Sequence, residues 1–258
     1  MERKKINNIA SVAIIIRASN PSQIFIELKD DGYPMKTFRR CLCPIGGNWI
    51  GEAAKCDQNP LDTVRREIME EICLEKRTAS TIELDLLGIK PGRSFYQVPT
   101  IDQIPTSDDI KILDELKQVI AEGLVPFGDY INTIPKSVLD RSDPENERDG
   151  FSALVSYWAV ALDEQRWKEI TALQEKFGNL SNESITLVTS VDEIIEVGVK
   201  TAFGHDRPLK EFFLCYGLHS AQQFPLINGI SSQEIGKPLA SYQEYLERYE
   251  ILKKPKFL

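Results

Sequence analysis

The chain has 258 residues, 42% hydrophobic and 27% charged, which suits one large globular domain or a domain with additions. The formal net charge is −8 with a pI near 5.0, and the sequence contains no basic block that could follow a nucleic-acid backbone. We therefore expect no nucleic-acid partner. No stretch reaches 18 apolar residues, so we also expect no membrane span and a cytoplasmic protein.

The first part of the chain alternates apolar runs with turn residues. Residues 8–17 are β-branched and apolar and predict a central strand, and residues 23–28 predict a second strand that pairs with it in a hairpin. Residues 38–44 predict a short strand. A helix is expected to begin within residues 59–62, with Asp62 as its N-cap.

The rest of the chain predicts short strands and amphipathic helices in alternation, with a charged, turn-rich loop (DRSDPENERDG) over residues 140–150. Strands are predicted over residues 82–90, 94–98, 151–162 and 185–188, and helices over residues 107–121, 163–177, 191–196, 208–216 and 241–252. This alternation predicts an α/β fold with a mixed central sheet.

The most informative stretch is residues 46–74. Within it, residues 66–71 (REIMEE) place Glu67, Glu70 and Glu71 at positions i, i+3 and i+4, which share one face of a helix. Like charges on one face repel each other and add nothing to the stability of a helix. Hard divalent cations such as Mg²⁺ and Mn²⁺ take carboxylate oxygens as ligands, so the pattern favours a site for one of them.

A glycine-rich turn precedes this helix. Gly46, Gly47 and Gly51 allow the backbone to adopt positive φ and to approach a ligand closely, and Glu52 follows directly. The order of glycine turn, acidic residue and Arg-Glu-x-x-Glu-Glu helix resembles the Nudix box, G-x5-E-x7-R-E-U-x-E-E-x-G-U, in which U is apolar. Residues 46–52 match its first part, and residues 66–71 with the apolar residue at 74 match its second part.

The sequence departs from the Nudix box in two places. Thirteen residues instead of seven separate Glu52 from Arg66, so an insertion of six is expected within residues 55–60. Cys73 stands where the pattern has glycine, which removes the usual helix stop, so the helix is expected to continue through residues 74–76.

The resemblance implies an α/β/α sandwich in which the box helix packs against the sheet. We expect this domain to span residues 1–216, with an inserted helical and loop segment at about residues 99–149. Residues 217–258 are expected to form a C-terminal extension that is helical at least in part.

The resemblance also implies an activity, the hydrolysis of a pyrophosphate bond in a nucleoside-diphosphate-linked substrate by attack of water on phosphorus at a Glu-bound Mg²⁺ or Mn²⁺. The implied metal ligands are Glu67, Glu70 and Glu71, joined by Glu52 and by Gly46 through its carbonyl. Arg66 would hold the carboxylates in place through charge-assisted hydrogen bonds, so Arg66, Glu70 and Glu71 are the expected catalytic residues.

The general base stays open, because it often lies outside the box in this family. Glu71 is one candidate, and Glu145, Glu147 and Glu193 are others.

Substrate-binding candidates are Arg39 and Arg93 for the phosphates and Phe203 for stacking on a base. His205 is a candidate for phosphate binding or proton transfer, with a hydrogen-bonded structural histidine near a helix start as the alternative.

Two alternatives concern function and assembly. A Nudix-fold regulator that binds a nucleotide without hydrolysing it would show the same motif, because a fold does not fix its function. In either case the expected partner is a nucleotide-type small molecule, and a homodimer is possible.

Overall fold

The computed structural model describes residues 4–50, 57–74, 80–84, 94–98, 103–134, 151–181, 183–190, 201–216 and 241–251. The strands are β1 (Lys4–Ile6), β2 (Asn8–Arg17), β3 (Asn20–Leu28), β4 (Leu42–Cys43), β5 (Ile45–Asn48), β6 (Ser80–Leu84), β7 (Ser94–Val98), β8 (Val125–Ile134), β9 (Phe151–Leu162), β10 (Ile185–Ser190) and β11 (Tyr249–Ile251). The helices are α2 (Pro60–Glu71), α3 (Ser107–Glu122), α4 (Glu164–Phe177), α6 (Asp206–Tyr216) and α7 (Tyr242–Arg248), with the short 3-10 helices η1 (Lys36–Phe38) and η3 (Ala202–Gly204).

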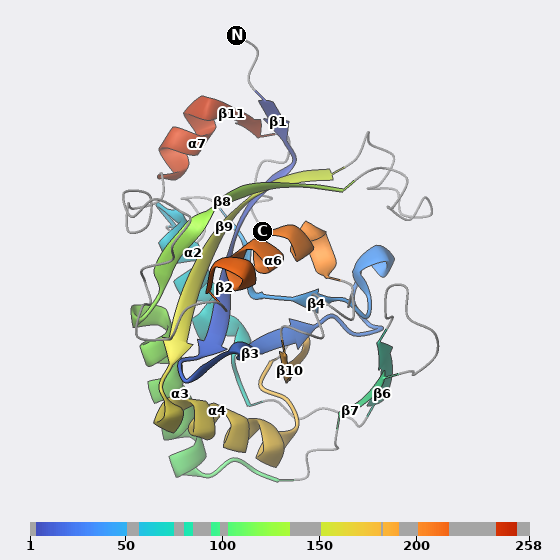
Figure 1. Ribbon diagram of the computed structural model, residues 1–258, viewed down its shortest axis with the longest axis vertical. Coiled ribbons are helices and arrows are strands. Elements are labelled where there is room, and N and C mark those ends of the chain that lie inside the picture. Colours follow the sequence, from blue (N-terminus) through green and yellow to red (C-terminus); the bar gives the residue numbers. More distant parts are fainter. Residues whose placement is uncertain are drawn as a thin grey trace.

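The main sheet is mixed and has the strand order β10-β3-β2-β9-β8, with β4 paired to β3 and β5 paired to β2 (Figure 1). Strand β2 runs parallel to β9 over its whole length, whereas its pairings with β3 and β5 are antiparallel. Both β2 and β9 are apolar on both faces, as is typical of strands in the middle of a sheet that is covered on both sides.

Helices cover both faces of this sheet. On one face, α2, α3 and α4 contribute Ile68, Leu116 and Trp167 to a core that includes Ile15. On the other face, α6 packs its apolar side onto a second core, with Phe212 fully buried. The three layers confirm the expected α/β/α sandwich with a mixed central sheet, and α2 lies against β2 and β5 as the resemblance implied.

Several element boundaries agree with the sequence predictions. Strands β2 and β9 have the predicted limits, and the β2–β3 hairpin is present with its turn at residues 18–19. Helix α4 begins after Asp163, whose side chain accepts a hydrogen bond from the Arg166 backbone. The strand predicted over residues 82–90 overlaps β6 at residues 82–84, and the rest of it lies outside the described residues, as do the helix predicted over 191–196 and the loop at 140–150.

Three predictions about helix ends were wrong. The N-cap of α2 is Asn59, and Asp62 is its partner at the third position in a reciprocal capping box. Helix α2 ends at Glu71, because Ile72 is extended and forms a β-bridge with Ser181. The last helix ends at Arg248, because the next three residues form β11 and pair in parallel with β1.

Strand β8 was not predicted. It is the edge strand beside β9, and its register shifts between Pro126 and Gly128. Proline and glycine both weaken a strand pattern, and an edge strand with a bulge tolerates them. Part of the segment expected as an insertion therefore supplies a strand of the main sheet. No helix among the described residues is long and apolar enough to cross a membrane.

Candidate active site

The start of α2 is fixed to the centre of the sheet. Pro60 is at the first helical position, where its missing N–H costs nothing, and its carbonyl accepts a hydrogen bond from the Ser11 hydroxyl of β2 at 2.7 Å. Val64 and Ile68 bury the inward face of the helix. This anchoring directs the neighbouring face, with Glu67 and Glu71, toward β5.

Arg66 is the centre of a carboxylate cluster. Its Nε and Nη2 donate to Asp57 Oδ2 at 3.1 and 3.0 Å, and its Nη1 donates to Glu67 Oε1 at 2.6 Å and Glu70 Oε2 at 3.1 Å. Nη2 also donates to the Asn48 carbonyl at 3.1 Å. Burial by itself lowers the pKa of Arg66, but the hydrogen bonds to Asp57 and Glu67 outweigh burial and raise it. The guanidinium therefore stays charged and binds all three carboxylates.

The glycine turn lies directly against these carboxylates. Gly46 has φ 144°, and a Cβ there would lie 2.3 Å from the Ser11 carbonyl oxygen, so only glycine fits. Its N–H donates to Glu71 Oε2 at 3.1 Å. A Cβ at Gly47 would lie 2.5 Å from Glu67 Oε1. Both glycines thus permit close approach of a buried carboxylate to the backbone.

A second buried charge network lies beside Glu71. Lys29 Nζ donates to Glu27 Oε2 and to Ser184 Oγ, both at 2.9 Å, and Ser181 Oγ donates to Glu27 Oε1 at 2.8 Å. The Lys29 and Glu27 side chains are only 5% and 0% exposed. Burial alone would lower the pKa of Lys29, but the neighbouring acidic groups raise it, so the ammonium stays charged.

Burial makes the charged form of two α2 carboxylates unfavourable. Burial and repulsion from Glu27 raise the pKa of Glu71 well above its ordinary value, although Lys29 opposes the shift. Burial also raises the pKa of Glu67, although Arg66 opposes the shift. Both shifts show that ionised carboxylates here have less positive charge around them than they would need for full compensation.

The donor chemistry at α2 fits a hard divalent cation, but the arrangement does not gather a ligand set. Among the described residues, no group of three Asp, Glu, His or Cys side chains is placed to hold a metal ion. Glu67 and Glu70 converge on Arg66, and Glu71 binds the Gly46 N–H. Joint ligation of a metal ion by these three glutamates therefore stays a prediction.

Six of the residues singled out in the sequence lie outside the described part of the chain: Gly51, Glu52, Arg93, Glu145, Glu147 and Glu193. Their roles stay predictions.

Phe203 lies in an aromatic cluster beside the charge networks. Its ring centroid is 4.2 Å from that of Phe38 and 6.3 Å from that of Tyr33, and Lys29 Nζ lies 5.4 Å from the Tyr33 ring centroid. Phe203 has φ 52°, an uncommon conformation for an aromatic residue and one that often marks functional sites. Arg39 does not join the Arg66 cluster, because its Nε donates to the Tyr33 carbonyl at 2.7 Å.

His205 takes the structural alternative. It is buried just before α6, where its Nδ1 and the Tyr157 hydroxyl form a hydrogen bond at 2.6 Å, and Asn132 donates to the Tyr157 oxygen at 2.8 Å. Burial lowers the pKa of His205 to about 3, so the imidazole is neutral at physiological pH.

Sequence reasoning missed Asp57, Glu27 and Lys29. Glu27 on β3 and Lys29 directly after the strand carried a signal, because two opposite charges at i and i+2 of an extended apolar segment point to the same face. Asp57 carried none, because its partner Arg66 is nine residues away.

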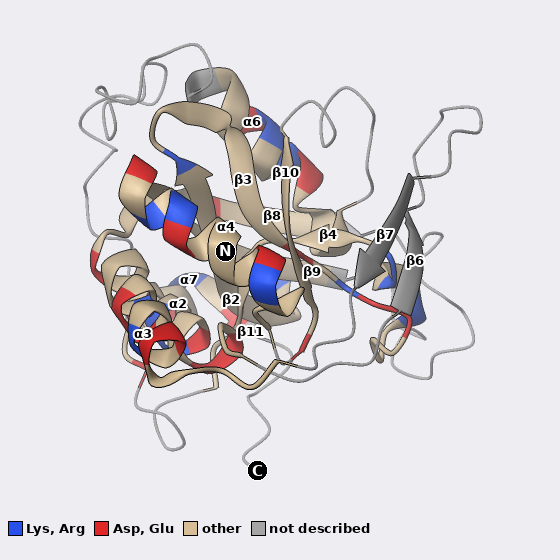
Figure 2. Cartoon of the chain, turned by 90° about the horizontal axis from the view of Figure 1, so that it is seen from below, with Lys and Arg blue, Asp and Glu red and all other residues tan. Residues whose placement is uncertain are grey.

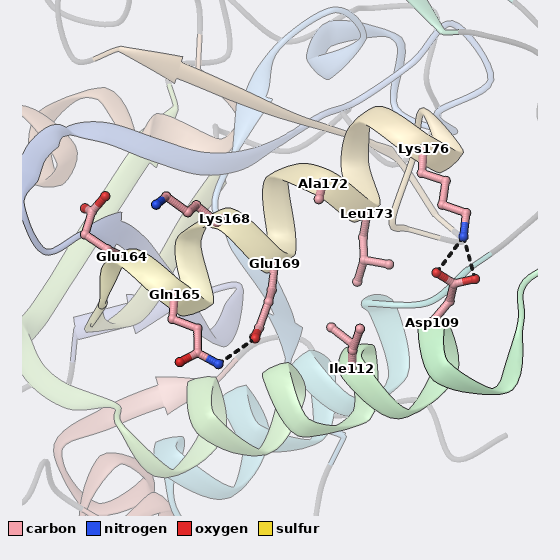
Figure 3. A pocket seen from close by; sticks show the side chains of 9 residues that line it. All are labelled: Asp109, Ile112, Glu164, Gln165, Lys168, Glu169, Ala172, Leu173 and Lys176. Carbon is pink, nitrogen blue, oxygen red and sulfur yellow. Dashed lines mark hydrogen bonds and ion pairs between the residues drawn. The ribbon is translucent and has the colours of Figure 1, made fainter.

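An open groove of ≈ 600 Å³ lies elsewhere, between α3 and α4 (Figure 3). Ile112, Ala172 and Leu173 line it, and the ion pair between Asp109 and Lys176 closes one end. The outer faces of these helices carry acidic and basic residues side by side (Figure 2). None of the α2 carboxylates lines this groove.

Comparison with known proteins found similarity in structure only. No protein-family model matches the sequence, and no curated protein matches it. The chain is similar to two solved Nudix hydrolases. One, from Alicyclobacillus acidocaldarius, is 12% identical with a TM-score of 0.41, over 82% of this chain and 93% of its own. The other, from Nitrosomonas europaea, is 11% identical with a TM-score of 0.37, over 81% of this chain and 88% of its own. Similarity this distant leaves the function to be inferred from the residues themselves.

Proposed function

We propose that this protein hydrolyses a pyrophosphate bond in a nucleoside-diphosphate-linked substrate with the help of Mg²⁺ or Mn²⁺. The observation that carries the proposal is the pair of buried glutamates, Glu67 and Glu71, packed against Gly46 and Gly47 with their pKa values raised. Where the negative charge of buried carboxylates is not fully balanced by nearby positive groups, binding of a cation is favourable.

Glu67 and Glu71 would hold the cation, with Glu70 beside them on the same helix. When bound, a divalent cation neutralises part of the diphosphate charge and polarises a water molecule. Arg66 keeps the carboxylates oriented, and Asp57 keeps Arg66 oriented. Tyr33 and Phe203 offer aromatic surface for the base of the substrate, and Lys29 lies 5.4 Å from the Tyr33 ring centroid and interacts electrostatically with Glu71.

A second candidate function is a nucleotide-binding regulator without hydrolase activity. One observation favours it, because Glu67 and Glu70 already bind Arg66, at 2.6 and 3.1 Å. In that case a ligand would bind at the site without being cleaved.

A substrate panel separates the two functions. The panel contains nucleoside triphosphates, dinucleoside polyphosphates, nucleotide sugars, NAD and coenzyme A, each with Mg²⁺, Mn²⁺ or chelator, and phosphate and nucleotide release are measured. Cleavage of one class that chelator abolishes supports the hydrolase. Calorimetric binding of a nucleotide without cleavage of any class supports the regulator and rejects the hydrolase.

Variants test whether the chemistry occurs at α2. Glu70→Gln and Glu71→Gln should each lower turnover by roughly two orders of magnitude or more while the circular dichroism spectrum stays unchanged. The matched control is Glu115→Gln, because Glu115 is a partly exposed glutamate on α3. Full activity in both α2 variants would reject the proposed site.

A further inference from the structure

Helix α7 comes from the C-terminal part of the chain yet lies against the segments that flank the carboxylate cluster. Figure 1 shows α7 and β11 beside β1 at one end of the molecule. Strand β11 follows α7 directly and pairs with β1, which fixes the helix at its C-terminal end. The helix buries two tyrosines, Tyr242 and Tyr245, each only 1% exposed.

Tyr242 contacts three parts of the site at once. Its ring stacks on that of Trp49, which follows the glycine turn, with centroids 4.5 Å apart and planes at 25°. Its backbone N–H donates to the Gln58 carbonyl at 3.2 Å. Its hydroxyl lies 2.5 Å from Thr63 Oγ1 on the first turn of α2.

The donor in the last contact follows from the next one. Thr63 has a single hydroxyl hydrogen, which it donates to Asp57 Oδ2 at 3.0 Å, so Tyr242 must donate its own hydrogen to Thr63. Asp57 in turn accepts from Arg66, and its carbonyl accepts from Trp49 Nε1 at 3.1 Å. A continuous series of hydrogen bonds therefore leads from α7 to the guanidinium.

The orientation of Arg66 depends on this series because the α2 carboxylates do not restrain it alone. Glu70 is 44% exposed, whereas the Asp57 side chain is 3% exposed and binds two nitrogens of the guanidinium. A paired contact with a buried carboxylate fixes the plane of an arginine better than one exposed contact does. Asp57 is thus one of two buried anchors of Arg66, together with Glu67 at 2.6 Å, and Tyr242 and Thr63 hold Asp57.

We propose that Tyr242 is a positioning residue for the carboxylate cluster, acting through Thr63, Asp57 and Arg66 to place Glu67. The geometric part of this inference is independent of the proposed hydrolase, and its effect on turnover rests on that function. Helix α7, from the C-terminal part of the chain, thereby becomes part of the candidate active site. In the hydrogen bonds described above, it acts on Glu67 only through Thr63, Asp57 and Arg66.

The test compares Tyr242→Phe and Tyr242→Leu with Tyr245→Phe in the full chain. Tyr242→Phe removes only the hydrogen to Thr63, and Tyr242→Leu also removes the stacking on Trp49. Tyr245→Phe is the matched control, because it removes a hydroxyl of the same helix that donates to Asp129 at 2.5 Å. Circular dichroism checks the fold of each variant.

The first readout is hydrogen exchange of peptides covering residues 57–66, which does not require activity. Tyr242→Phe should speed their exchange about fivefold, as expected when one hydrogen bond is lost, and Tyr245→Phe should not change it. Wild-type exchange in Tyr242→Phe, or an equal change in Tyr245→Phe, would overturn the inference. If Tyr242→Leu fails to fold, the exchange measured in Tyr242→Phe alone still tests the positioning role.

The second readout is kinetic and applies once a substrate is known. Tyr242→Phe should lower kcat about tenfold and raise the half-saturating Mn²⁺ concentration while KM changes less than twofold, because the carboxylates and not the substrate contacts are disturbed. An unchanged kcat and Mn²⁺ dependence in Tyr242→Phe would reject the catalytic part. If the wild-type chain cleaves no substrate, the proposed function fails, and the exchange measurement still decides the positioning role.

Discussion

The buried ion pair between Lys29 and Glu27 gives a sharp prediction about stability. In Lys29→Met, the Glu27 carboxylate stays fully buried and keeps Ser181 as a hydrogen-bond donor, but it loses its cation. Removing one partner of a buried ion pair typically costs ~3–5 kcal/mol, because the remaining charge is desolvated and unpaired. In a chain of this size each kcal/mol lowers Tm by about 2–4 °C, so Tm should fall by roughly 6–20 °C.

The assay is thermal and urea unfolding followed by circular dichroism, in chelator so that bound metal does not contribute. Arg207→Met is the control, because Arg207 pairs with Glu211 on the surface of α6 with 75% of its side chain exposed, and it should change Tm little. The double variant Glu27→Gln with Lys29→Met should recover most of the loss, because no buried charge remains.

The pH dependence of this effect also follows. The folded pKa of Lys29 is raised above its ordinary value of 10.5, so the stability it contributes is fully present below pH 10.5 and is lost only as pH rises further. Lys29 itself therefore contributes the same stability to the unchanged chain at pH 6 and pH 9. If Lys29→Met lowered Tm no more than Arg207→Met does, the view that burial makes the Lys29–Glu27 pair essential to stability would be refuted.

Three further predictions test the site and its surroundings. Gly47→Ala should lower turnover by about 100-fold, because the added Cβ would displace the Glu67 carboxylate. Gly128→Ala is the control and should leave turnover unchanged, because its Cβ would lie 3.4 Å from the nearest neighbouring atom. Equal kinetics in the two variants would contradict this prediction. Glu71→Gln should raise the Tm of the metal-free protein at pH 8, because a raised pKa in the folded state means that ionised Glu71 destabilises the fold. This increase in Tm should vanish as pH falls toward 4.5. An increase in Tm that grows at low pH would contradict the predicted direction of the pKa shift. The NMR signals of the His205 ring should stay constant from pH 5 to 8, because its pKa is about 3, and a midpoint near 6.5 would show an ordinary histidine.

Local patterns in the sequence were sufficient for the elements whose stabilising interactions are local or periodic. Strands β2 and β9 could be read from continuous apolar runs, and α4 from its periodicity and the aspartate before it. The carboxylate face of α2 and the need for glycine at position 46 were also readable, because helical spacing fixes the first and backbone sterics fix the second. The end of α2 was not, because tertiary pairing of Ile72 overrode the expected continuation.

The sequence by itself determined the α/β class, the two central strands and the acidic face of one helix. Only the tertiary structure decided which charges meet. Arg66 finds Asp57 through the path of the chain before α2, Lys29 is enclosed by Ser184 at a separation of 155 residues, and Tyr242 reaches Thr63 across 179 residues. Propensity and periodicity act over a few residues, whereas hydrogen bonds between buried polar groups depend on how whole layers pack, and no local pattern carries that information.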